Sequence, residues 1–201
     1  MNEVPMAGIL NGDGSYTKGI EDFLLENGQY RTDEHQKTVV EDILENWEVI
    51  SHGRKFHGIF ATSSIPEAVE YYGRFKLQAP DLKVTALFDP SIDNNGTGIE
   101  KEEALAEIIA DYNARFHQTF TIPTYGKMKK DIQLRLAHKR PYERIERMPE
   151  EQLDLLIVVD QMLTGFDSKW RNVLYLDKVL RYESIIQAFS RTNRLFGLEK
   201  P

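Results

Sequence analysis

Residues that could bind a phosphate group gather near the C-terminal end of the sequence. The apolar pattern predicts a helix from Glu183 to Phe196, and Gln187, Arg191 and Arg194 fall on one side of it. An amide and two guanidiniums held together suit phosphate oxygens, because each guanidinium presents a planar fork of N–H donors. The apolar residues on the opposite side, which could pack against a sheet, are Ile185, Phe189 and Phe196. An ordinary helix with a solvated charged face has the same pattern, so spacing alone leaves both interpretations open.

Two apolar runs precede that helix and are the elements that must position it. Leu155–Val159 is rich in β-branched residues, as expected of a strand buried on both faces. Val173–Leu176 is a second run of this kind and ends at Asp177. Between the two runs, the segment Leu163–Asp167 contains a glycine and is predicted to be a loop.

Two further strands are predicted earlier, at Gly58–Thr62 and Lys83–Phe88. Ser63 and Ser64 follow the first of them, and Ser64 with Glu67 has the spacing of a capping box at a helix start. A strand, a hydroxyl-bearing turn and a helix N-terminus form a natural phosphate site, although simple capping explains the same serines. The polar residues that follow predicted strand ends are Thr62, Ser63, Thr164–Asp167 and Asp177. In a parallel sheet these ends meet at one edge, where ligands bind.

The rest of the pattern is mainly helical. The predicted helices run from Asp33 to about Ile50, from Ser64 to about Leu77, from Glu102 to Phe116 and from Met128 to His138. We expect Asp33 to cap the first helix, with Gln36 completing a capping box, and Trp47 to lie in the core. The residues that the second helix is expected to bury are Ala68, Val69, Tyr72 and Phe75.

Strands that alternate with helices predict an α/β fold with a parallel sheet flanked by helices. The helices at about residues 100–150 lie between strands, which predicts a helical insertion. Residues 1–32, with the turn-rich stretch Asn11–Ser15, are interpreted as a connecting segment before a domain that spans residues 33–201.

Composition excludes several classes of protein. The chain has 201 residues, no cysteine and a net charge of -7, which argues against a disulfide framework and against a small obligate nucleic-acid binder. No apolar run has the roughly 20 residues of a membrane helix, and no secretory signal is evident, so we expect a cytoplasmic protein without a membrane partner. Residues 127–147 form the most basic segment, for which a solvated helix face is the simplest interpretation. The histidines show no metal-binding spacing, so no metal site is predicted.

Three segments resemble the motifs of one enzyme class. Gln187–Arg194 is similar to motif VI of superfamily 2 helicases and translocases, with Ser190 where glycine is commoner. Thr164–Asp167 resembles their motif V, and the turn at Thr62–Ser64 matches motif IV. In this order and spacing, the motifs resemble the motor region of the restriction (R) subunit of type I restriction-modification enzymes.

The resemblance implies a RecA-like, P-loop NTPase-type lobe and a role for each motif residue. Arg191 and Arg194 would be catalytic arginine fingers. The implied nucleotide-binding residues are Gln187, Gly165 and Asp167, and the implied DNA-binding residues are Thr62, Ser63, Ser64 and Thr164. The sequence lacks a G-x-x-x-x-G-K-[ST] phosphate loop and a magnesium motif, so it resembles the second motor lobe only. We therefore expect the chain alone to be inactive and to bind neither ATP nor Mg²⁺ tightly.

The family also implies partners. These would be double-stranded DNA, the modification and specificity subunits, the first motor lobe and a nuclease domain, and ATP with Mg²⁺ would serve the intact ATP-dependent endonuclease. Two other hypotheses remain: a helicase-like lobe that acts as a non-catalytic protein or nucleic-acid interaction module, and a flavodoxin-like binder of small molecules with a merely solvated arginine face.

Overall fold

The computed structural model describes residues 9–17, 32–89, 98–159, 168 and 170–177. The chain divides into two compact units, residues 1–41 and 42–201. In the first unit, Ile9–Leu10 (β1) pairs antiparallel with Tyr16–Thr17 (β2) around the predicted turn. Gly14 supports this turn, because its φ of 83° lies in the left-handed region that glycine enters without strain.

Helix α2 spans Asp33–Ile50 and crosses from the first unit into the second. The predicted cap at Asp33 is wrong. Asp33 is already helical, and the Thr32 hydroxyl before it accepts a hydrogen bond from the His35 backbone N–H at 3.2 Å. The core position predicted for Trp47 is confirmed, since this side chain is 2% exposed.

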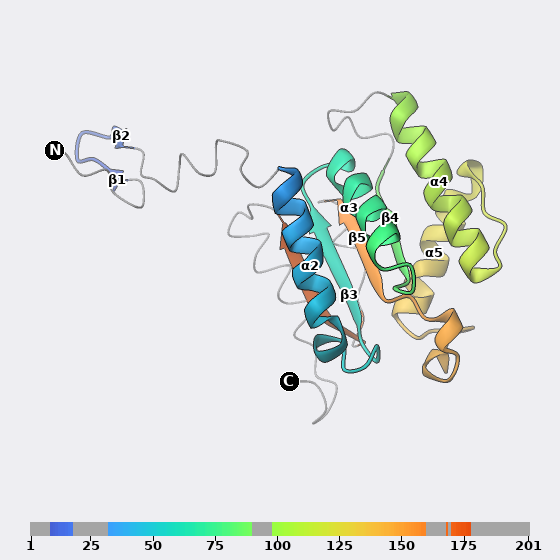
Figure 1. Ribbon diagram of the computed structural model, residues 1–201. Helices are drawn as coiled ribbons and strands as arrows, with labels where there is room; N and C mark the ends of the chain where they lie inside the picture. Colours follow the sequence, from blue (N-terminus) through green and yellow to red (C-terminus); the bar gives the residue numbers. More distant parts are fainter. Residues whose placement is uncertain (1–8, 18–31, 90–97, 160–167, 169, 178–201) are drawn as a thin grey trace. The chain divides into compact units, whose positions relative to one another are not determined.

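The second unit contains a four-stranded sheet in the order β4-β5-β3-β6 (Figure 1), and all its strand pairs are parallel, as predicted. The strands are β3 (His57–Thr62), β4 (Val84–Leu87), β5 (Leu155–Val159) and β6 (Arg171–Asp177). Helix α3 (Ile65–Gln78) packs on β3, β4 and β5, and α4 (Gly98–Phe116) lies beside β4. The strand predictions are therefore confirmed to within two residues at each end.

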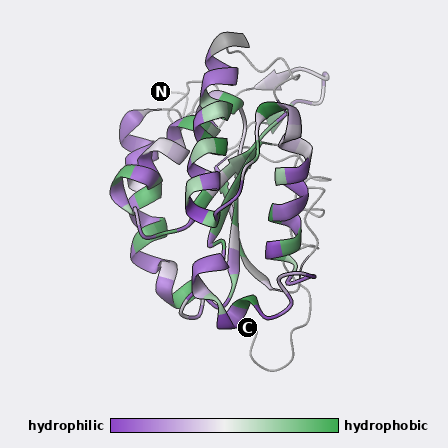
Figure 2. Ribbon diagram, turned by 90° about the vertical axis from the view of Figure 1, so that its right-hand side faces the viewer, coloured by the Kyte–Doolittle hydropathy of each residue, from purple (hydrophilic) through white to green (hydrophobic). Residues whose placement is uncertain are grey.

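The two central strands form the core of this unit. Every residue of β3 and β5 is buried, which explains why these segments read as continuous apolar runs rather than alternating ones. Figure 2 shows the hydrophobic colour on the strands and mixed colours on the surrounding helices. Gly58 is required by close packing, because a Cβ atom there would lie 2.9 Å from both Leu155 Cδ1 and Trp47 Cζ3.

The helices of the insertion begin earlier than predicted. Helix α4 starts at Gly98 rather than Glu102, and α5 spans Tyr125–Leu136, with the short 3-10 turn Ile122–Thr124 (η2) before it. Two further 3-10 turns, Ile145–Arg147 (η3) and Pro149–Glu151 (η4), lead back to β5.

One expected core residue of α3 is only half-buried. Val69 is partly exposed, whereas Tyr71 is completely buried and takes the place that the apolar pattern gave to Val69. The other three residues that this helix was expected to bury, Ala68, Tyr72 and Phe75, are confirmed in the core.

A buried arginine holds the helical insertion together. Arg135 of α5 is 0% exposed, and its Nε donates to Asp131 at 2.8 Å while one terminal nitrogen donates to the Glu151 carboxylate at 2.6 Å. Its guanidinium carbon lies 4.2 Å from the ring centroids of both Phe116 and Tyr142. This residue belongs to the predicted basic segment, yet it contributes nothing to the charge of the surface.

A pair of buried histidines joins the insertion to the amino edge of the sheet, the edge at which its strands begin. His57 Nδ1 donates to the Leu153 carbonyl at 2.5 Å, and its Nε2 lies 2.8 Å from Nε2 of His138. Because a carbonyl only accepts, the proton of neutral His57 sits on Nδ1, and His138 must donate the shared one. His138 also stacks on Trp170, with 3.9 Å between ring centroids.

Among the described residues, no helix combines the length and the apolar composition that crossing a bilayer requires.

Candidate functional site

Three strands end at the same level on the carboxyl edge of the sheet. Thr62, the last residue of β3, is paired in register with Val159 at the end of β5 and with Asp177 at the end of β6. On the far side, Leu87 of β4 pairs with Val158. The chain segments that leave these strands therefore start from one line, which is where parallel α/β sheets bind ligands.

Thr62 closes the end of β3. Its side chain is completely buried, and its hydroxyl donates toward the carbonyl oxygens of Ser64 and Val158 at 3.3 and 3.4 Å. These contacts tie the turn after β3 to the neighbouring strand β5. Thr62 thus positions the residues that follow it.

The turn after β3 is organised by Glu67 at the start of α3. The Glu67 carboxylate accepts hydrogen bonds from the Ser63 backbone N–H at 2.9 Å and the Ser63 hydroxyl at 2.6 Å. Ser64 is the N-cap residue of α3, and its hydroxyl accepts from the Glu67 N–H at 3.4 Å. The predicted capping box is half correct, since Glu67 reaches the backbone N–H of Ser63 and not that of Ser64.

Tyr71 links this helix to the end of β6. Its hydroxyl donates a short hydrogen bond to the Asp177 carboxylate. Its ring is completely buried and meets Phe60 edge to face, with 4.6 Å between centroids. Burial, together with the bond to Asp177, raises the pKa of Tyr71 well above its usual value, so the phenol keeps its proton. Asp177 is thereby held at the carboxyl edge.

The sequence pattern predicted Thr62, Ser63 and Asp177 at one edge, and the structure brings them together there. The pattern did not indicate Glu67 as the acceptor for Ser63 or Tyr71 as the partner of Asp177. The remaining predicted site residues lie outside the described part of the chain; they are Thr164, Gly165, Asp167, Gln187, Arg191 and Arg194.

Both of the undescribed motifs follow strands that end on this edge. Thr164 comes five residues after Val159, the last residue of β5. Gln187 comes ten residues after Asp177, the last residue of β6. The chain therefore enters both segments from the carboxyl edge, at the level of Thr62.

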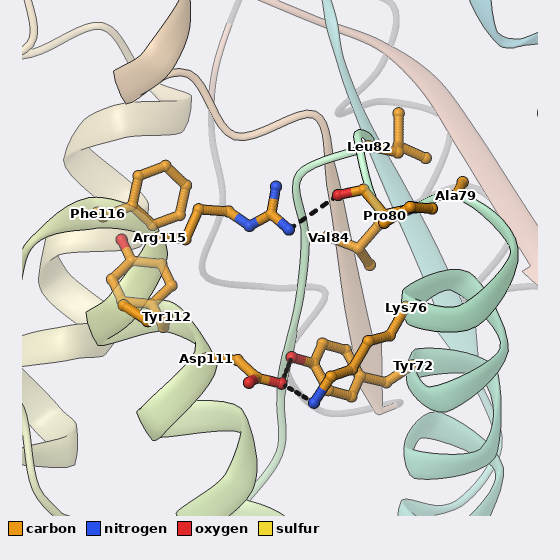
Figure 3. Close-up of a pocket in the computed structure, with 11 residues that line it drawn as sticks. Tyr72, Lys76, Ala79, Pro80, Leu82, Val84, Asp111, Tyr112, Arg115 and Phe116 are labelled. Carbon is orange, nitrogen blue, oxygen red and sulfur yellow. Dashed lines mark hydrogen bonds and ion pairs between the residues drawn. The ribbon is translucent and has the colours of Figure 1, made fainter.

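A pocket of about 350 Å³ lies between α3 and α4, near the amino end of β4 (Figure 3). Asp111 accepts hydrogen bonds from the Tyr72 hydroxyl at 2.7 Å and from the Lys76 ammonium at 2.6 Å. Arg115 reaches across to donate to the Pro80 carbonyl at 3.0 Å. These bonds connect α4 to α3 and to Pro80 just after it, so the polar groups of the pocket stabilise helix packing. The pocket lies away from the carboxyl edge.

Two carboxylates at the carboxyl edge are already bonded within the protein, Glu67 to Ser63 and Asp177 to Tyr71. In the described part of the chain, no group of three or more His, Asp or Glu side chains is close enough to hold a metal ion. The Ser64 hydroxyl accepts the Glu67 N–H and keeps its own proton, a donor that suits an oxyanion such as a phosphate.

Comparison with known proteins gives a consistent result. The family model described as type I restriction enzyme subunit R domain 3 matches residues 54–201. The endonuclease subunit of the type I restriction enzyme SsaAORF53P from Staphylococcus saprophyticus is 35% identical over 179 residues, which cover 85% of this chain. The corresponding subunit of SauMRSORF196P from Staphylococcus aureus is 33% identical over 178 residues, or 84% of this chain.

Similarity is not confined to staphylococcal proteins. A putative type I restriction enzyme endonuclease subunit of Methanocaldococcus jannaschii, MjaVIIP, is 33% identical over 101 residues, covering 47% of this chain and 9% of that protein. The chain spans only 18% of the length of each of the two staphylococcal subunits. By the family match and by these identities, the chain belongs to the family of type I restriction enzyme R subunits, in the region known as domain 3.

Proposed function

We propose that this domain is the second motor lobe of an ATP-dependent DNA translocase within an R subunit, and that it works with a first lobe, a nuclease domain, and modification and specificity subunits. The observation that carries the proposal is the common level at which β3, β5 and β6 end. A motor lobe needs nucleotide and DNA contacts that move together. Residues that directly follow adjacent strand ends of one sheet move as a single body and meet that need.

The nucleotide contacts are assigned to the two C-terminal motifs. Arg191 and Arg194 would stabilise the charge that develops on the transferred phosphoryl group, an effect worth about 10³ to 10⁵ in rate for known arginine fingers. Gln187 would position these groups, Gly165 would allow a tight loop, and Asp167 would contact the ribose or the arginines. ATP and its Mg²⁺ would be held mainly by the first lobe.

The DNA contacts are assigned to the turn after β3 and to Thr164. Ser64 is the best donor of the three residues in that turn, because its hydroxyl accepts the Glu67 N–H and keeps its own proton for a phosphate oxygen. Ser63 already donates both its N–H and its hydroxyl to Glu67, so a phosphate would have to displace that carboxylate. Thr62 contributes by fixing the turn.

The test uses the intact R subunit with its partner subunits and DNA. Arg194→Ala should lower DNA-dependent ATP hydrolysis by about 10³ or more while thermal unfolding is unchanged. Lys37→Ala is the control, since this side chain is 60% exposed and lies outside every proposed nucleotide or DNA contact. ATP hydrolysis that survives Arg194→Ala would overturn the motor assignment and favour a non-catalytic interaction module.

A further inference from the structure

The helical insertion carries an unusual concentration of positive charge. Residues 127–147 contain eight basic residues against three acidic ones, a net charge of +5. Because the whole chain has a net charge of -7, the remaining residues carry -12 between them. Arg135 is the one buried basic residue in this segment, and the others, all exposed or half-buried, are Lys127, Lys129, Lys130, Lys139, Arg140, Arg144 and Arg147. We call these seven residues the basic track.

The basic track extends from one edge of the sheet to the other. Helix α5 starts at the carboxyl edge, where the Tyr125 hydroxyl donates to the Phe88 carbonyl at 2.9 Å just beyond β4. Near its other end, His138 contacts His57 at the amino edge. A helix of 12 residues is about 18 Å long. Three lysines lie in its first half, and the other four basic residues lie beyond its end.

The cations of the track are largely uncompensated. Within the described part of the chain, the only ion pair of a track residue is Arg140 with Glu143, at 3.9 Å between two exposed side chains. Such a pair contributes little to stability or to charge neutralisation. Asp131 and Glu151, which could have neutralised the track, are bound to the buried Arg135 instead. The fold therefore directs two carboxylates inward and leaves the lysines facing solvent.

The chemistry of this surface favours a polyanion over a protein partner. Protein interfaces are depleted in lysine and have an apolar centre. Between residues 125 and 147, the described chain exposes no large hydrophobic side chain. Duplex DNA carries one negative charge per about 1.7 Å of its axis, so basic residues spread along a helix of about 18 Å can face several phosphates at once.

We propose that the basic track binds the phosphate backbone of duplex DNA, as a second contact in addition to the turn after β3. This inference rests on the proposed function, since a motor that moves on duplex DNA supplies the ligand. The contact would be independent of base sequence, because lysine side chains recognise phosphates without reading bases. Part of the contact with DNA would then lie on the helical insertion, outside the helicase motifs.

The experiment measures binding of the intact R subunit to a 30-base-pair duplex, a length of about 100 Å at 3.4 Å per base pair, by fluorescence anisotropy at several salt concentrations. The triple variant K127Q/K129Q/K130Q should bind more weakly. The slope of log K against log salt should become shallower by about 0.9 for each phosphate that the protein no longer neutralises, or about 1.8 for the exposed Lys127 and Lys130, which share one face of α5. Lys130→Gln alone should reduce the slope by about 0.9. Lys37→Gln, on an exposed lysine of α2, should leave the slope unchanged.

Three results would overturn the proposal. They are an unchanged slope in the triple variant, weaker binding that is confined to single-stranded DNA, and failure to assemble with the other subunits without any change in the slope. The outcome is separate from that of Arg194→Ala. A reduced slope together with intact ATP hydrolysis in the arginine variant would leave the track as a DNA site in a domain that is not a motor.

Discussion

Arg135 gives the sharpest test of how the insertion is held. Replacing it with alanine would leave Asp131 and Glu151 without their cation and would remove bonds of 2.8 Å and 2.6 Å to these carboxylates. It would also remove a donor to the Glu151 backbone carbonyl at 2.7 Å and the stacking between two aromatic rings. Removing one partner of a buried ion pair costs about 3–5 kcal/mol. We therefore expect the free energy of unfolding to fall by about that amount, a large share of the roughly 5–15 kcal/mol typical of a domain.

The assay is urea unfolding of this chain at neutral pH, followed by circular dichroism. Arg135→Lys should lose less stability than Arg135→Ala, because the ammonium keeps the charge but cannot bond both carboxylates in the same fork. Arg140→Ala is the control, and its exposed position predicts a change within about 0.5 kcal/mol. A decrease of less than about 1 kcal/mol for Arg135→Ala would refute the view that this guanidinium holds the insertion in place.

Two further predictions concern the sheet. Burial, and secondly the neighbouring His138, lower the pKa of His57 from 6.5 to about 3. Between pH 6.5 and about 3, the unfolded chain therefore binds a proton that the folded chain does not. The free energy of unfolding should fall by about 1.4 kcal/mol for each pH unit of acidification in that window. His57→Gln should flatten the pH dependence measured by urea unfolding, whereas a change at the exposed His52 should leave it intact, and an equal slope in both variants would contradict the argument. Gly58→Ala should destabilise the chain by about 1–3 kcal/mol, because the new methyl group would press on Leu155 and Trp47. A thermal unfolding midpoint equal to that of the parent chain would show that these neighbours can yield.

The sheet was predictable from the sequence because its strands are continuous apolar runs. Leu155–Val159 was predicted with the observed bounds, because its five residues are all apolar and buried and the run is flanked by Asp154 and Asp160. The helix ends were predicted less well. Thr32 and Asp33 are adjacent and both can cap, and only the backbone decides which one lies outside the helix.

The candidate site was predictable in its location but not in its bonding. Parallel strands make Thr62 and Asp177 neighbours once the register is known, yet no local pattern pairs Tyr71 with Asp177 across more than a hundred residues. Arg135 did carry a signal. It lies four residues after Asp131 and in step with the buried Met128 and Ile132, a spacing that marks the inward face of α5.

Tyr125 has a consequence for how the molecule meets other chains. Strand β4 is the outermost of the described sheet on its side, and a bare outer strand is a template for intermolecular pairing and aggregation. The Tyr125 phenol accepts from the Phe88 N–H at 3.2 Å and donates to the Phe88 carbonyl, so one side chain satisfies both backbone groups just past the strand. A foreign strand would therefore find the Phe88 backbone groups already bonded, with α4 lying alongside β4.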